Sequence, residues 1–149
     1  MLRSRSALAG FAAGAFVLTA ATAGPAAAAP TGFSVEITAH TDFTSPDSSE
    51  FDSSLTGCES GSVVNGDKVN GAFTPWGGTF VGHKLFTCEG GESGFTLALR
   101  ARFGGGGSTG TWTVVSGFGD LEGVKGSGSL VGISTSQTSI DDIYTGTFR

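Results

Sequence analysis

The segment from Thr111 to Phe148 constrains the fold more than any other part of this chain. It contains three short runs with β-strand composition, namely Thr111–Ser116, Ser127–Ile133 and Ser139–Phe148. The corner between the first two runs is spaced by glycines: Gly117, Gly119, Gly123, Gly126 and Gly128. Glycine lets the backbone take positive φ angles and approach its neighbours closely. Strands joined by such corners predict a small all-β body that is closed or nearly closed.

The N-terminus has the layout of a cleaved secretory signal peptide. Arg3 and Arg5 precede an uncharged apolar stretch, Ala7–Ala21, and small residues in an A-x-A arrangement follow at Ala26–Ala29. A membrane span is the alternative, but it needs about 20 apolar residues and this stretch runs into prolines. We therefore expect residues 1–29 to be a signal peptide, residues 30–149 to form a single β-barrel domain, and the mature protein to be secreted and extracellular.

The charge balance restricts the partners of the mature domain. Residues 30–149 hold six basic and thirteen acidic side chains. This acidic balance argues against nucleic acid and against an anionic membrane surface as partners. We expect no membrane attachment of the mature form, while oligomerisation stays open.

Two cysteines, Cys58 and Cys88, are present. Secretion places them in an oxidising compartment, and two cysteines allow one intrachain pairing. A reactive thiol or a metal ligand is the alternative, but neither cysteine has a CxxC partner or a histidine at ligand spacing. The sequence predicts a structural disulfide.

Clean alternation of apolar and polar residues predicts further strands at Phe33–His40, Thr79–Cys88 and Ser93–Phe103. The polar stretch Thr41–Ser62 has no such pattern and is interpreted as a loop. Ser62–Phe73 is interpreted as a hairpin region, because Asn-Gly-Asp within it is a turn signal. Seven or eight strands result, with no helix beyond a short turn around Asp120–Gly123. The residues predicted to lie inside are Phe95, Leu97, Leu99, Val114 and Leu130.

The glycine-rich C-terminal pattern G-T-W-T-V-V-x-G-x-G…G-x-G-x-L with a closing Y-T-G-x-F resembles the family of allene oxide cyclases and dirigent proteins. The matching residues include Gly110, Trp112, Gly128, Leu130, Tyr144, Gly146 and Phe148. The likeness is strongest to small secreted bacterial members and covers about the last 70 residues. It implies an eight-stranded antiparallel barrel whose apolar interior holds a hydrophobic small molecule. None of the family's catalytic residues can be carried over by motif.

Candidate ligand-binding residues come from the interior faces of these strands. Asp142 shares a face with Ile140, Tyr144 and Phe148, and an inward aspartate beside a tyrosine is able to bind or protonate a ligand; a solvated strand end is the alternative. Lys84 lies on the face of Phe80, Phe86 and Cys88, with the same two interpretations.

The other candidates are one histidine and the aromatic residues. His83, between Val81 and Leu85, is either an inward acid–base group or a half-buried outward residue. Phe86, Trp112 and Tyr144 either line a cavity or pack a core.

Three function classes stay open. The chain has no nucleophile elbow, metal-ligand cluster or phosphate loop, so we expect no metal and no organic cofactor. The favoured class is a non-enzymatic secreted barrel that binds a small hydrophobic ligand in its interior. The alternatives are a cofactor-free cyclase or isomerase, indicated by an inward acid–base pair in a cavity, and an extracellular self-associating protein, indicated by a filled barrel with an apolar outer patch.

Overall fold

The computed structural model describes residues 31–42, 44, 49–66, 70–74 and 77–149. The predicted signal peptide, residues 1–29, lies outside this part of the chain. The described residues form nine strands: β1 (Phe33–Asp42), β2 (Ser49–Ser53), β3 (Ser60–Asn65), β4 (Asn70–Thr74), β5 (Gly77–Cys88), β6 (Gly94–Gly104), β7 (Gly107–Phe118), β8 (Gly126–Ser134) and β9 (Ser139–Phe148). Among these residues no helix is long and apolar enough to cross a membrane.

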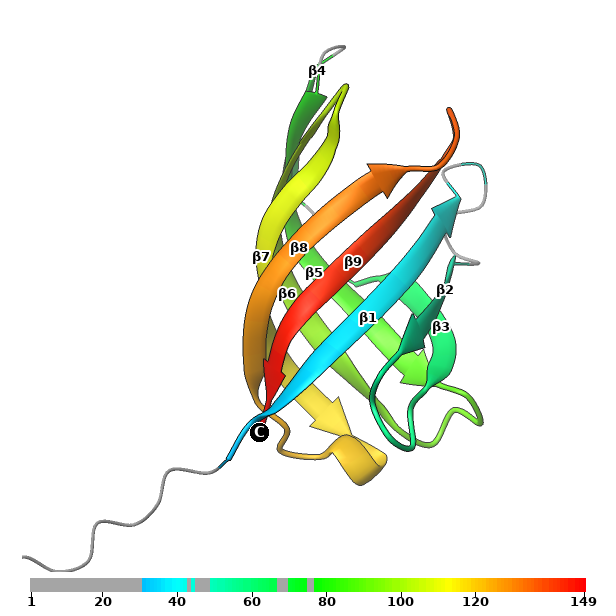
Figure 1. Cartoon of the computed structure of the whole chain (residues 1–149), viewed down its shortest axis with the longest axis vertical. Coiled ribbons are helices and arrows are strands. Elements are labelled where there is room, and N and C mark those ends of the chain that lie inside the picture. Colours follow the sequence, from blue (N-terminus) through cyan, green and yellow to red (C-terminus); the bar gives the residue numbers. More distant parts are fainter. Residues whose placement is uncertain (1–30, 43, 45–48, 67–69, 75–76) are drawn as a thin grey trace, which may run out of the picture.

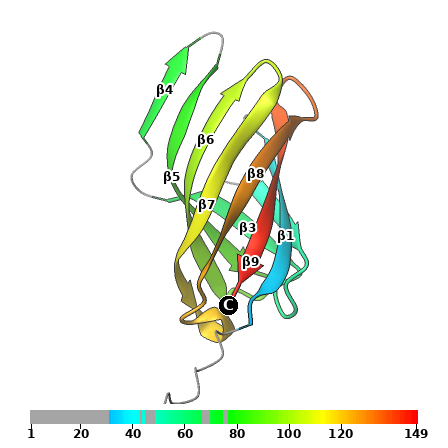
Figure 2. The same ribbon diagram turned by 60° about the vertical axis from the view of Figure 1, so that its left-hand side comes forward.

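The strands close into an eight-stranded antiparallel barrel, which confirms the predicted fold class. Neighbouring strands follow the order β3-β2-β1-β9-β8-β7-β6-β5-β4, and β3 also pairs with β5 (Figure 1). Closure depends on the length of β5. Its second half, Lys84–Cys88, pairs with β3, while its first half, Gly77–Val81, pairs with β4. Strand β4 therefore stays outside the ring and pairs with the first half of β5, whose other edge pairs with β6, at one end of the barrel (Figure 2).

Two interpretations of the N-terminal half are wrong. The stretch Thr41–Ser62 contains the whole of β2 and the start of β3. Strand β2 carries a single large apolar residue, Phe51, so it lacks the repeated alternation that marks a strand in sequence. The expected hairpin at Ser62–Phe73 is replaced by two strands that both pair with β5. Between β7 and β8 a single 3₁₀ turn, Gly119–Leu121, occupies the place of the predicted helical turn.

The predicted interior faces are confirmed. Phe95, Leu97, Leu99 and Leu130 are buried, and Val114 is half-buried against the same core. The end of the barrel that holds Cys88, the start of β6 and the end of β9 is called the disulfide end here. The opposite end, with the β6–β7 and β8–β9 turns, is called the cavity end.

Aromatic side chains fill the disulfide end. Phe86 stacks on Phe95 with a centroid distance of 4.9 Å and meets Phe51 and Tyr144 edge-on at 5.2 and 5.6 Å. Phe148 joins this group through Phe95 at 5.3 Å and Trp112 at 5.8 Å. Edge-on and offset contacts of this kind stabilise a core beyond the apolar area they bury.

Glycines make room for the largest ring. In the sheet Trp112 pairs with Gly128, and Gly128 pairs with Gly146. A Cβ atom at either glycine would lie only 2.7 or 2.6 Å from the indole of Trp112. The indole nitrogen donates a hydrogen bond to the Ser129 carbonyl oxygen at 2.9 Å. The glycine spacing that marks this segment in sequence thus serves close packing of Trp112.

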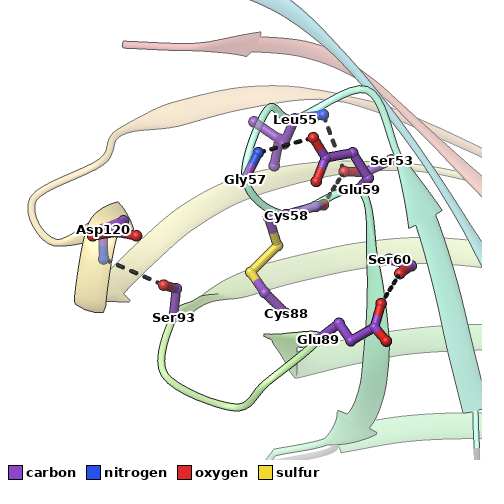
Figure 3. The surroundings of a disulfide bond; sticks show 10 residues. All are labelled: Ser53, Leu55, Gly57, Cys58, Glu59, Ser60, Cys88, Glu89, Ser93 and Asp120. Carbon is purple, nitrogen blue, oxygen red and sulfur yellow. Dashed lines mark hydrogen bonds between the residues drawn. A yellow bond between two sulfur atoms is a disulfide. The ribbon is translucent and has the colours of Figure 1, made fainter.

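A disulfide joins Cys58 to Cys88, as predicted, with a Cα–Cα distance of 5.0 Å (Figure 3). Both cysteines are buried. The β2–β3 connection around Cys58 is also ordered by hydrogen bonds, because the Ser53 hydroxyl donates to the Cys58 carbonyl and accepts from the Leu55 amide. The bridge ties this connection to the end of β5.

Candidate functional site

A cavity of about 450 Å³ occupies the cavity end of the barrel and is partly open to solvent. Its apolar wall comprises Phe80, Leu99, Ala101, Phe103, Leu130 and Ile140. Its polar lining includes Thr41, Lys84, Ser108 and Asp142. A largely apolar cavity with a few polar groups is the usual form of a small-molecule site.

Small side chains at several inward positions make room for the cavity. On β6 the inward side chains become smaller from Phe95 through Leu97 and Leu99 to Ala101, before the half-buried Phe103 completes the cavity wall. On β1 the inward series continues from Ile37 to Ala39 and Thr41, and on β8 the inward position level with Ala39 is Gly132. At the disulfide end aromatic rings fill the interior, whereas at the cavity end these small side chains leave part of the interior empty.

A buried ion pair crosses this space. The Lys84 ammonium donates to Asp142 Oδ2 at 3.4 Å, and the Ser108 hydroxyl donates to Asp142 Oδ1 at 3.3 Å. The three residues come from β5, β9 and β7, and no two of these strands are neighbours in the barrel. Only closure of the barrel brings Lys84 and Asp142 together across 58 positions of sequence.

Gly132 lets the carboxylate and the hydroxyl meet. It pairs with Ser108 on one side and with Asp142 on the other. A Cβ atom here would lie 2.6 Å from Asp142 Oδ1 and would also collide with Ser108 Oγ. Glycine is therefore required between these two polar residues for them to make contact.

Burial of this pair is costly. The side chains of Lys84 and Asp142 are only 11% and 12% exposed. Desolvation of two charges often exceeds their mutual attraction, and apolar residues of similar volume would stabilise the same position as well or better. The pair is thus a poor choice for stability alone and a good choice for contacting a polar group of a ligand.

Tyr144 lies one inward position from Asp142 along β9 and is fully buried. Its hydroxyl has no hydrogen-bond partner among the described residues. Burial, together with the nearby charge of Asp142, raises the pKa of this phenol well above its ordinary value. Tyr144 therefore stays protonated and neutral.

The structure separates the predicted site residues into three places. Asp142 is inward and lines the cavity, as does Lys84. Phe86, Trp112 and Tyr144 are inward but belong to the packed aromatic core rather than to the cavity lining.

His83 occupies the third place. It alternates with buried Gly82 and Lys84, so its half-buried side chain lies on the outer face of β5 and away from the cavity.

Sequence reasoning did not select Ser108 or Thr41. Ser108 follows a run of glycines and Thr41 is the second-last residue of β1, and a hydroxyl residue is unremarkable in sequence at either position. Lys84 and Asp142 were each recognisable as charged residues on apolar faces, but their contact with one another was not predicted. The sequence signal for Lys84 was that it is the one charged residue among the apolar inward residues of β5.

No group of three or more histidine, cysteine, aspartate or glutamate side chains in the described part of the chain is placed to hold a metal ion. No protein-family model, curated protein sequence or solved structure matches this chain. The barrel architecture is confirmed by the structure, whereas the relation to allene oxide cyclases and dirigent proteins stays a prediction.

Proposed function

We propose that this protein is a secreted barrel that binds a small hydrophobic molecule in the cavity at its cavity end. The observation that carries the proposal is the cavity of about 450 Å³, walled mainly by apolar side chains. Binding there would remove the ligand's apolar surface from water while the polar lining orients it. The resemblance to barrels that hold hydrophobic molecules supports the same conclusion.

Extracellular localisation is part of the proposal. The buried Cys58–Cys88 disulfide is compatible with an oxidising compartment. The signal-peptide pattern in residues 1–29 supports it independently.

Self-association is less well supported. The large apolar residues exposed on the outer surface are Phe33, Val81, Val115, Phe118, Val131 and Ile133. Apolar atoms form a large part of any protein surface, so exposed apolar residues do not by themselves indicate an interface. A barrel that is hollow at one end favours ligand binding over this alternative.

The test is titration with a neutral fluorescent probe, N-phenyl-1-naphthylamine, using a cavity-filling variant. Ala101→Leu adds three carbons at the cavity wall, and Ala98→Leu makes the same change on the outer face of β6. We expect saturable binding that weakens by about tenfold or more, equivalent to about 1.4 kcal/mol, in Ala101→Leu only. Absence of saturable binding, or equal loss in both variants, would contradict the proposal.

A second candidate, a cofactor-free isomerase or cyclase, is favoured by one specific observation. Lys84 and Asp142 form an inward acid–base pair within the cavity. Isomerisation of a carbonyl compound needs a group that removes a proton beside the carbonyl and a group that donates to its oxygen. Hydrogen–deuterium exchange at the methyl group of a bound methyl ketone, followed by NMR in D₂O, tests this function. Exchange no faster than in buffer would eliminate it.

A further inference from the structure

Lys84, Asp142 and Ser108 form a buried polar cluster whose hydrogen-bond donors and acceptors are not used to the same extent. Both carboxylate oxygens of Asp142 already accept a hydrogen bond, one from Lys84 and one from Ser108. An ammonium group has three N–H donors, and Asp142 is the partner the described structure shows for Lys84. Among the described residues, the Lys84 ammonium thus has N–H donors to spare, whereas each Asp142 oxygen already has a partner, and this favours a ligand that presents an acceptor atom.

Thr41 adds a second polar group to the same cavity. Its hydroxyl oxygen is buried and has no hydrogen-bond partner among the described residues, although Thr41 lines the cavity. A buried hydroxyl without a partner carries a desolvation cost. A ligand oxygen that accepts from this hydroxyl would remove that cost.

The net charge of the cluster selects against an ionised ligand. Lys84 and Asp142 together are neutral when both are charged. A ligand carboxylate that accepted from Lys84 would lie near the Asp142 carboxylate in a poorly solvated space, and like charges repel strongly there. A neutral acceptor receives the hydrogen bond without this penalty.

We propose that Lys84 holds the carbonyl oxygen of an uncharged, otherwise apolar ligand, with Thr41 as a second donor in the same cavity. The ligand class is a ketone, aldehyde or ester whose hydrocarbon body lies against Leu99, Leu130 and Ile140. This inference rests on the proposed function and specifies the ligand class of the same site.

The test compares three probes that share one ring system. They are 2-acetylnaphthalene, which has a neutral carbonyl, 2-ethylnaphthalene, which has no acceptor, and 2-naphthoate, which is charged. Isothermal titration of the wild-type protein at neutral pH should show the ketone binding about tenfold or more tightly than the hydrocarbon. The naphthoate should bind more weakly than the ketone.

The matched variant is the double substitution Lys84→Met with Asp142→Asn. It removes both charges together, because loss of one partner would leave a lone buried charge that destabilises the fold. The asparagine amide oxygen is still able to accept from Ser108. Lys125→Met, at an exposed position near the disulfide end, is the control for loss of a lysine.

We expect the double variant to bind the ketone and the hydrocarbon equally and Lys125→Met to behave as wild type. The infrared stretching band of a ¹³C-labelled ketone carbonyl should lie lower on the wild-type protein than on the double variant, since a hydrogen bond to an ammonium weakens the carbonyl bond. A change that acted only through folding would not move this band.

The remaining outcomes overturn one proposal or both. Equal binding of ketone and hydrocarbon by the wild type refutes the carbonyl anchor and leaves hydrophobic ligand binding supported. Preference for the ketone that survives in the double variant, or tightest binding of the naphthoate, also refutes the anchor. No binding of any probe overturns the proposed function and the anchor with it.

Discussion

The two ends of this barrel share their strands and differ in what those strands direct inward. At the disulfide end the interior consists of aromatic rings in contact, closed by a covalent bridge. At the cavity end several inward positions are alanine, glycine or serine, and a charged pair lies in the cavity beside apolar side chains such as Phe80 and Leu99. The first arrangement maximises packing, whereas the second gives up packing and exposes polar groups to a cavity.

This difference indicates that the disulfide end mainly stabilises the fold, whereas the cavity end is suited to ligand binding. Close packing contributes most of the stability of small domains, and cavities and buried charges reduce it. The stability contributed by close packing at the disulfide end then offsets the stability lost to the cavity and the buried charges at the cavity end. Substitutions at the two ends should differ accordingly, with stability lost at one and ligand binding lost at the other.

The largest expected effect is at the centre of the aromatic core. Phe86→Ala removes a ring that contacts three other rings and is fully buried, so it should lower the free energy of unfolding by about 3–5 kcal/mol. Leu99→Ala at the cavity wall should cost about 2 kcal/mol, since its side chain already borders unfilled space. Urea denaturation of both variants measures the difference. Equal losses would show that the two ends are packed alike.

The disulfide is the next contribution to the packed end. It closes a loop with a sequence separation of 30 residues. Replacing both cysteines, Cys58→Ser with Cys88→Ser, should lower the free energy of unfolding by about 3–4 kcal/mol on the chain-entropy account. Under conditions in which this variant is folded, it should still bind the probe in the cavity at the opposite end of the barrel. A loss below about 1 kcal/mol would mean that hydrogen bonds of the β2–β3 connection suffice to hold it.

Much of the barrel was predictable from the sequence, and the incorrect predictions have a physical cause. Long strands such as β1, β6 and β9 alternate over enough residues to reveal both faces, and Asp142 was recognisable on one of them. Strand β2 is short, with one inward aromatic residue, and it is recognisable only from the partners that it pairs with. The branching of β5 between β3 and β4 depends on barrel closure, which local sequence does not encode.

The candidate site was predictable only in part for the same reason. Asp142 and Lys84 were each recognisable as charged residues on apolar faces. Their contact depends on two strands that are far apart in sequence and not adjacent in the sheet. Ser108 reaches Asp142 past Gly132, and a steric requirement of this kind becomes evident only when three strands are in register.

Gly132→Ala should lower stability less than the loss of Phe86 or of the disulfide, but it should change ligand binding more than either. The new methyl group would displace Ser108 and Asp142 and should cost about 1–3 kcal/mol as overpacking. It should also abolish the preference for the ketone over the hydrocarbon probe. The control is Gly106→Ala in the β6–β7 turn, where an added Cβ meets nothing within 4 Å. Retention of the ketone preference in Gly132→Ala would show that the polar cluster tolerates displacement.

The smallest effect contrasts the buried ion pair with one on the outer surface. His40 Nδ1 lies 2.9 Å from Asp141 Oδ1, and Nε2 lies 3.4 Å from Asp52 Oδ2, with the histidine side chain 47% exposed. The hydrogen bond to Asp141, partly opposed by desolvation and assisted by Asp52, raises the pKa of His40 above its ordinary value. The folded state therefore favours the protonated form of His40.

The sign of the pH dependence follows from that shift. A raised pKa in the folded state stabilises the protein fully below the unfolded value near 6.5, and the contribution disappears as pH rises through the folded pKa. Because the pair is screened by solvent, we expect only a few tenths of a kcal/mol. The difference in unfolding free energy between wild type and His40→Gln should be larger at about pH 5.5 than at about pH 8.5. Asp52→Asn with Asp141→Asn should remove that pH dependence, and a difference that grows with pH would contradict the assignment.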